Sequence, residues 1–386
     1  MSKIGNLGSH LYSGEVSYDI VGRRRRWYAL SGVILLLALL GLGVRGLNLG
    51  IEFKGGAEFV IPASSCSVES ARDAITGAGA QDPIVQQLGN GQIRAQTAEL
   101  TAEQSASVLT NLSTACGVPR TDIKVQLVGS TWGGEITSKA IQGLLIFMVA
   151  VTIFLSIYFE WRMAVAALVA LVHDLVITIG IYALVGFEVT PATVIGILTI
   201  LGFSLYDTVV VFDKVKENTK GILGQSRMTY SEAANLAVNQ TIVRSINTSI
   251  VALLPVASIL FVGAGLLGAG TLKDLALALF VGTAAGTYSS IFVATPFMCQ
   301  MKEKQPAIKA LAARVAVRRA GLNKKEAQRA GRGQVEGSAV ADGGEPAAGV
   351  AAGVGTAAVV HKERAHRTTG PRNQPKNTAR SKRSKK

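Results

Sequence analysis

Long apolar runs, more than any short motif, limit what this chain can fold into. A run of about eighteen or more apolar residues is long enough to cross the hydrocarbon core of a bilayer as a helix. Six such segments are present, at residues 27–44, 140–158, 163–186, 191–211, 248–267 and 275–298. Because 49% of the residues are hydrophobic and only 17% are charged, the composition is typical of polytopic membrane proteins. The sequence therefore predicts a polytopic α-helical membrane protein with six transmembrane helices.

The first run has an alternative interpretation as a cleaved signal peptide, because four arginines, Arg23 to Arg26, stand directly before it. The run is long for the apolar part of such a peptide, and residues 43–45 (Gly-Val-Arg) make a poor cleavage site. We therefore expect an uncleaved membrane anchor.

Basic residues predict the orientation, because cytoplasmic segments are rich in Lys and Arg. Residues 302–386 carry 20 basic and 6 acidic residues, which accounts for the whole net charge of +14. The segment between the fourth and fifth runs carries Lys214, Lys216, Lys220 and Arg227, whereas residues 46–138 hold five basic against nine acidic residues. Both termini are therefore expected in the cytoplasm, with residues 46–138 on the other side.

The expected organisation has five parts. Residues 1–26 form a cytoplasmic segment, 27–47 the first helix, 48–138 an extracytoplasmic domain, 139–300 the other five helices, and 301–386 a basic, largely disordered tail. The charge of the tail suits anionic lipid headgroups or ribosomal RNA, but reinforcement of the topology is the favoured explanation. No specific nucleic-acid partner is expected, because aromatic residues are not interleaved with the basic ones.

The extracytoplasmic segment reads as one small α+β domain between helices one and two. Strands are expected at residues 57–61, 84–88, 92–96 and 123–128, and helices at 68–76 and from Thr101 to about Ala115. Thr101 and Gln104 form a capping box, and residues 89–91 (Gly-Asn-Gly) signal a hairpin. The order βαββαβ predicts a ferredoxin-like fold.

Cys66 precedes the first helix of this domain and Cys116 follows the second. Antiparallel packing of the two helices would bring these ends together, so a Cys66–Cys116 disulfide is one expectation, permitted outside the cytoplasm. Two unrelated buried thiols are the alternative.

Hydrolytic, redox and metal chemistry find no support in the sequence. No phosphate-binding loop follows a strand, and the four histidines form no cluster with metal-ligand spacing. We expect no enzymatic activity, no cofactor and no metal.

Ionisable residues inside the apolar runs are the candidate functional groups, because a charge at the bilayer centre costs about 2.5–3.5 kcal/mol. Asp207 lies within the fourth run, and Ser204 lies on the same helical face. His173 and Asp174 interrupt the third run, either as a structural hydrogen bond or as part of a polar pathway with Asp207.

Arg244 at the start of the fifth run is the candidate cation for Asp207, and it either pairs with that carboxylate or reaches the membrane surface. Gly282 and Gly286 predict a face for close helix packing rather than chemistry.

Several of these motifs, in this order, resemble the SecF family of bacterial protein translocation. They are residues 49–56 with Gly55 and Gly56, residues 172–174, residues 202–218, Arg244 with its Asn/Thr-rich sequel, and residues 282–296. Two positions depart from the family pattern. Glu52 stands where Asp is usual, and Tyr206 stands where Asn is common before Asp207.

The resemblance implies membership of the resistance–nodulation–division superfamily and a location in the bacterial plasma (inner) membrane. It implies that the protein pairs with SecD, associates with the SecYEG channel, and uses the proton-motive force to help export preproteins after the SecA motor has acted. Asp207 and Arg244 would map onto residues implicated in proton passage. A proton-coupled half-transporter for a small molecule or lipid, and a purely structural assembly subunit, remain the alternatives.

Overall fold

The computed structural model describes residues 17–62, 66–81, 83–88, 90–266 and 270–338. Residues 1–326 form one compact unit, and residues 327–386 are grouped separately. The part of the tail that the sequence analysis expects to be disordered lies mainly outside the described residues, from residue 339 onward.

Six helices in the described part of the chain are long and apolar enough to cross a membrane. The six helices are α2 (Arg24–Arg45), α6 (Ser130–Tyr158), α7 (Trp161–Val185), α8 (Pro191–Asn218), α9 (Tyr230–Ser258) and α10 (Gly270–Ser289). A π-helix, η3 (Ile259–Leu266), extends α9, and a second, η4 (Ser290–Ala294), joins α10 to α11 (Thr295–Glu303). This is the polytopic helical fold that the apolar runs predict.

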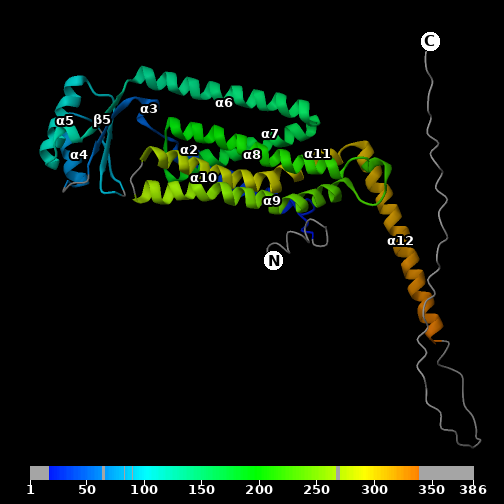
Figure 1. Ribbon diagram of the computed structural model, residues 1–386. Helices are drawn as coiled ribbons and strands as arrows, with labels where there is room; N and C mark the ends of the chain where they lie inside the picture. Colours follow the sequence, from blue (N-terminus) through cyan, green and yellow to red (C-terminus); the bar gives the residue numbers. More distant parts are fainter. Residues whose placement is uncertain (1–16, 63–65, 82, 89, 267–269, 339–386) are drawn as a thin grey trace, which may run out of the picture. The chain divides into compact units, whose positions relative to one another are not determined.

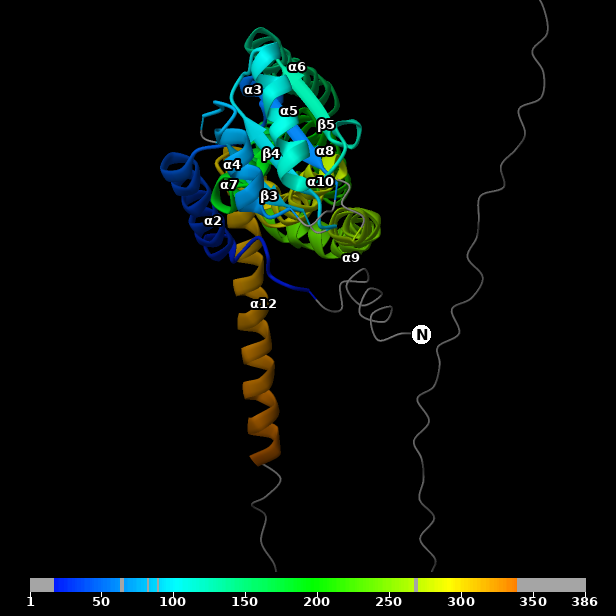
Figure 2. The same cartoon turned by 90° about the vertical axis from the view of Figure 1, so that its left-hand side faces the viewer.

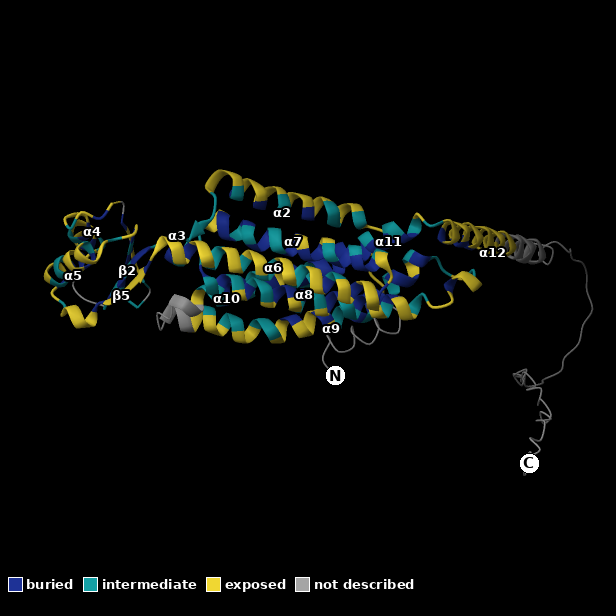
Figure 3. Ribbon diagram, turned by 90° about the horizontal axis from the view of Figure 1, so that it is seen from above, coloured by how far each residue is buried: buried dark blue, intermediate teal, exposed yellow. Residues whose placement is uncertain are grey.

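Helix α7 and the α10–α11 pair lie at the centre of the bundle, whereas α2, α6 and α9 lie at its edge. More than half of the apolar window of α7 and of α10–α11 is buried, against 11–17% for α2, α6 and α9. Figure 3 shows the same contrast, with dark blue along α7 and yellow along α2 and α9. Exposed large apolar side chains such as Leu36, Leu145 and Val251 lie on these edge helices, as expected of surfaces that face lipid.

Helices α6 and α9 begin earlier than the sequence analysis places their spans. Helix α6 starts at Ser130 instead of residue 140, and α9 starts at Tyr230 instead of residue 248. A capping box formed by Thr229 and Glu232 begins α9. The first turns of both helices carry polar side chains, so hydropathy alone excludes residues that are nevertheless helical.

The small α+β domain lies at one end of the bundle, here called the domain end; the opposite end, where α11 leads into α12 (Pro306–Ser338), is the tail end (Figure 1). Within the described residues, its sheet has the order β3-β4-β2-β5 and is antiparallel throughout. The strands are β2 (Gly56–Ile61), β3 (Ile84–Gln87), β4 (Ile93–Thr97) and β5 (Lys124–Val128). This order is that of a ferredoxin-like fold.

Helices α4 (Val68–Thr76) and α5 (Ala102–Cys116) cover one face of the sheet and pack with it around Phe59, Ile61 and Leu112. Figure 2 views this domain from the domain end, with α4 and α5 nearest the viewer. The other face of the sheet lies toward the bundle (Figure 1).

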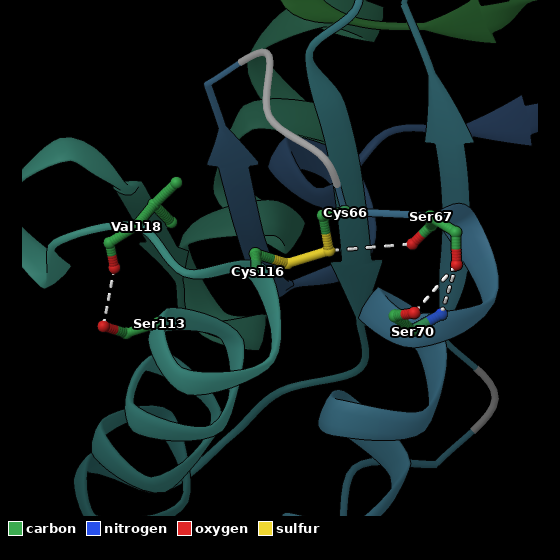
Figure 4. Close-up of a disulfide and its surroundings, with 6 residues drawn as sticks. All are labelled: Cys66, Ser67, Ser70, Ser113, Cys116 and Val118. Atoms are coloured by element: carbon green, nitrogen blue, oxygen red, sulfur yellow. Dashed lines mark hydrogen bonds between the residues drawn. A yellow bond between two sulfur atoms is a disulfide. The ribbon is translucent and has the colours of Figure 1, made fainter.

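A disulfide joins Cys66 to Cys116, as one of the two expectations from the sequence has it. Cys66 lies just before α4 and Cys116 is the last residue of α5, so the bond ties together the two helix ends (Figure 4). The Ser67 hydroxyl caps α4 by accepting from the Ser70 N–H at 3.0 Å.

A short link connects the domain to the bundle. Strand β1 (Asn48–Leu49) pairs in parallel with β6 (Glu188–Val189), which directly precedes the Thr190 cap of α8. A single-turn helix, α3 (Ile51–Lys54), then leads into Gly55 and Gly56. Both glycines have positive φ, and a Cβ at Gly56 would collide with the Thr97 carbonyl oxygen, so this tight passage requires glycine.

Candidate functional site

Asp174 lies on α7 in the centre of the bundle and has a full set of partners. Its Oδ2 accepts hydrogen bonds from the Ser204 hydroxyl (2.6 Å) and the Ser289 hydroxyl (2.8 Å), and its Oδ1 lies 3.2 Å from His173 Nδ1. The side chain is completely buried. These contacts join α7 to α8 and α10, so this carboxylate holds the three central helices together.

His173, the neighbour of Asp174 on α7, is buried as well. Its ring stacks on Tyr288, with centroids 6.2 Å apart, and no described residue provides a hydrogen-bond partner for its Nε2. The ring lines a cavity of about 590 Å³ between α2, α7 and α11, which Tyr28 and Gln300 also line. His173 therefore contacts the Asp174 carboxylate through Nδ1, and its ring also lines this cavity.

Asp207 on α8 is also buried, with 7% of its surface exposed, but its surroundings differ. Its Oδ2 makes no hydrogen bond in the described structure, and neither does the Oγ of the neighbouring Ser245. Ser245, Ser290 and Arg244 are its polar neighbours. Asp207 is thus a buried acid whose hydrogen-bonding capacity is only partly used.

Two consecutive serines at the junction of α10 and η4 lie beside the two acids, one beside each. Ser289 donates to Asp174, and the next residue, Ser290, lies beside Asp207 and 2.8 Å from the Thr208 hydroxyl. Ser290 also donates to the Ser204 carbonyl at 3.4 Å. A π-helix starts at Ser290, and such local widening of a helix frequently occurs at functional sites.

Ser204 lies on the buried face of α8, as expected, but it binds Asp174 and not Asp207. Its hydroxyl donates to Asp174, and no hydrogen bond between Ser204 and Asp207 occurs in the described structure. Ser204 and Asp207 lie on one face of α8, as their spacing predicts. This face contacts both α7 and α10, so the two residues have different partners.

Arg244 stands just before the fifth apolar run, as expected, but it lies fourteen residues inside α9, which begins at Tyr230. Its side chain is exposed, and its Nη2 lies 3.4 Å from the Tyr206 hydroxyl. No ion pair between Arg244 and Asp207 is found among the described residues. Tyr206, where the family more often has Asn, therefore contacts the arginine and is 53% exposed beside it.

Gly282 and Gly286 bring α10 against α8. A Cβ at Gly282 would collide with the Ile200 side chain, and one at Gly286 would lie 2.8 Å from the Ser204 Cβ. These glycines do more than permit packing, because the approach of Gly286 places Ser204 beside Asp174. The sequence analysis assigned only packing to this segment and missed Ser289 and Ser290, although two hydroxyls directly after the glycine face were a visible signal.

A second charged cluster lies between the domain and the bundle. Arg94 of β4 donates to Glu58 of β2 and to Glu188 of β6, both at 2.7 Å, and Gln96 bonds to the same two carboxylates. Glu52 lies nearby, and its Oε2 has no partner among the described residues. Burial raises the pKa of Glu52, and the carboxylates of Glu188 and Glu58 raise it further.

Comparisons with known proteins agree on one family. The model described as "Protein export membrane protein SecD/SecF, C-terminal" matches residues 108–304, and the "SecD/SecF GG Motif" matches residues 40–65, which include Gly55 and Gly56. The protein translocase subunit SecF of Streptomyces coelicolor is 56% identical over 83% of this chain and 86% of its own length. The SecF of Mycobacterium tuberculosis is 45% identical over 82% of this chain and 75% of its own.

Among solved structures, the translocon-associated membrane protein SecDF from Thermus thermophilus matches with a TM-score of 0.66 at 27% identity. The match covers 79% of this chain but only 40% of the SecDF chain. The order of helices, the GG motif and the two SecF relatives lead to the same assignment: the chain belongs to the SecF group of the SecD/SecF protein-export family.

Proposed function

We propose that this protein is an accessory subunit of the Sec translocase that, with a SecD partner, uses the proton-motive force to help export preproteins through SecYEG. It acts without enzymatic turnover, after the SecA motor has pushed the preprotein. The relatives named SecF support the translocase role, and the SecDF chain supports the partner. Because this chain matches 40% of SecDF, a separate SecD protein would provide the remainder.

The proposed orientation places both termini in the cytoplasm of a bacterial plasma membrane. The basic residues of the tail support it, as do Lys214 and Lys216 near the end of α8 and Lys220 and Arg227 just after it. The Cys66–Cys116 disulfide supports it independently, because disulfides persist on the oxidising side of that membrane. The basic tail would contact anionic lipid headgroups on the cytoplasmic side.

The observation that carries the proton-coupled mechanism is the partly satisfied carboxylate of Asp207. A proton carrier must exist in two states, and Asp207 lacks the full set of hydrogen-bond donors that would hold one state permanently. Arg244 is exposed beside Tyr206, on a face open to a partner. Its movement toward or away from Asp207 would change the proton affinity of the carboxylate.

Asp174, His173 and Ser204 form the second part of the proposed pathway, reached through Ser289 and Ser290. One charge that crosses a potential of 100 mV releases about 2.3 kcal/mol. That amount biases a choice between two arrangements of the bundle and the domain, which is what an accessory subunit needs.

The decisive experiment is Asp207→Asn in a strain that lacks the native protein, with Asp213→Asn as the matched control. Asp213 lies on the same helix but is exposed. We expect Asp207→Asn to impair secretion and proton uptake while SecD still copurifies, and Asp213→Asn to change neither.

Normal secretion in the Asp207→Asn strain would refute the proton role. Loss of SecD copurification would instead favour a purely structural assembly subunit. Absence of any SecD-type protein after purification of the unmodified chain in mild detergent would contradict the proposed pairing and favour a half-transporter.

A further inference from the structure

A short segment before α2 lies against the tail end of α9 and is held there by two asparagines. We call residues 17–21 the N-terminal strap. Asn239 Oδ1 accepts from the Tyr18 N–H at 2.8 Å, and Asn239 Nδ2 donates to the Tyr18 carbonyl at 2.9 Å. Asn235 Oδ1 accepts from the N–H groups of Ile20 (2.9 Å) and Val21 (3.1 Å). These contacts pair two side-chain amides with a peptide backbone, as a neighbouring strand would.

The strap is part of the core of the bundle and does not rest loosely on its surface. Ile20 and Val21 are 3% and 1% exposed, and Asn239 is completely buried. A buried amide without hydrogen bonds costs about 1–3 kcal/mol. The Tyr18 N–H donates to the side-chain carbonyl oxygen of Asn239. Without the strap, this buried oxygen would lose its hydrogen bond, so the strap stabilises Asn239 in α9.

Ile20 fills the space on the tail-end side of Asp207. It packs in one cluster with Val211 of α8, Val238 of α9 and Ile291 of η4. Val211 lies one helical turn, about 6 Å, beyond Asp207 toward the tail end. Ile291 directly follows Ser290. The cluster therefore fills the space between α8, α9 and η4 on the tail-end side of Asp207.

A turn fixes the strap to the first membrane helix. The Asp19 carboxylate accepts from the Gly22 N–H at 2.8 Å, and α2 begins two residues later at Arg24. A change in the position of α2 relative to α9 would therefore pull directly on Ile20.

We propose that the N-terminal strap is a gate: Ile20 seals the route between Asp207 and the aqueous phase at the tail end, and Asn235 and Asn239 are the positioning residues that hold it closed. The proton route itself rests on the proposed function. The seal does not, because it can be measured as access of water-soluble reagents.

The test measures labelling of Val211→Cys by a membrane-impermeant thiol reagent in inverted vesicles that contain the full-length chain and its SecD partner. Cys299→Ser removes the buried free thiol, and Cys66 and Cys116 are bonded to each other. With the strap intact, we expect slow labelling, because Val211 is fully buried. Ile20→Gly and Asn239→Ala should each raise the rate at least about tenfold, as local opening exposes a buried group.

Tyr18→Ala is the matched control, because the 55% exposed Tyr18 side chain is not needed for the backbone contacts with Asn239. It should leave the labelling rate unchanged. Equal labelling rates of Val211→Cys with and without Ile20→Gly would overturn the gate. Because Ile20→Gly leaves both asparagines in place, it keeps the test valid if Asn239→Ala fails to fold.

Proton leak through the same vesicles separates the gate from the function. Ile20→Gly should increase the leak, and Asp207→Asn in the same chain should abolish the increase. Faster labelling together with a leak that does not depend on Asp207 would keep the seal and refute the proton role of Asp207.

Discussion

Asp174 and Asp207 are two buried carboxylates in the same bundle with opposite surroundings. Asp174 contacts His173, Ser204 and Ser289 through its two carboxylate oxygens, whereas the Oδ2 of Asp207 makes no hydrogen bond in the described structure. A buried polar group is stable when its hydrogen bonds are complete and costly when they are not. The difference shows that Asp174 holds neighbouring helices together, and it supports the proposal that Asp207 is the acid that changes its protonation state.

The largest expected effect tests this division directly. Asp174→Ala should lower the free energy of unfolding by about 3 kcal/mol, because Ser204, Ser289 and His173 lose their acceptor together. Asp207→Ala should lower it by less than about 1 kcal/mol. Chemical unfolding of the two purified variants in detergent measures the difference, and equal losses would remove the distinction between the acids.

Gly286→Ala examines how the Asp174 cluster is assembled. The added Cβ would lie 2.8 Å from the Ser204 Cβ and force the Ser204 donor away, at a cost of about 2 kcal/mol. Gly202→Ala, on the same helix as Ser204, meets nothing within 4 Å and should be neutral. Comparable melting temperatures for the two variants would show that close packing does not position Ser204.

Ser290→Ala removes the hydroxyl beside Asp207 through which the proposed pathway reaches Asp174. We expect a loss of about 1 kcal/mol in stability, for one hydrogen bond to Thr208, together with a clear reduction in proton uptake. Ser258→Ala, which removes an exposed hydroxyl from α9, should change neither quantity. Unimpaired proton uptake in Ser290→Ala would mean that the acids work independently.

Glu52 has a buried carboxylate oxygen without a partner among the described residues, as Asp207 does. It lies outside the membrane-spanning helices, and the effect of its substitution is expected to be the smallest. Because its pKa is raised by burial and by Glu188 and Glu58, its contribution to stability is complete below its ordinary pKa and is lost as the pH rises through the raised value. Glu52→Gln should therefore raise the melting temperature at neutral pH and leave it unchanged in acid. The same pH series on Glu99→Gln, at an exposed position, should be flat.

The sequence predicted the architecture well where one local signal was sufficient. The apolar runs located six membrane helices, and the capping box at Thr101 and Gln104 starts α5 as expected. The helix at Val68–Thr76 has the expected bounds. Prediction failed at the first turns of α6 and α9, where polar residues are helical because packing and caps stabilise them.

The site was predicted as a set of residues but not as a set of contacts. Asp174, His173 and Ser204 do meet in the core, yet Ser204 turned out to serve Asp174, and Arg244 bonds to Tyr206. Sequence spacing gives the face of one helix but not the neighbour that this face meets. That neighbour depends on the glycine contacts between α8 and α10, which only the assembled bundle reveals.

The two-residue pairing of β1 with β6 has a mechanical consequence. It fastens the base of the small domain to the residues directly before α8, and the Gly50 N–H donates a further hydrogen bond to the Val189 carbonyl at 2.9 Å. Helix α8 has 28 residues and is about 42 Å long, so it behaves as a stiff rod. A displacement of the domain would therefore act on the first turn of this helix, which also carries Asp207, on the order of 25 Å further along.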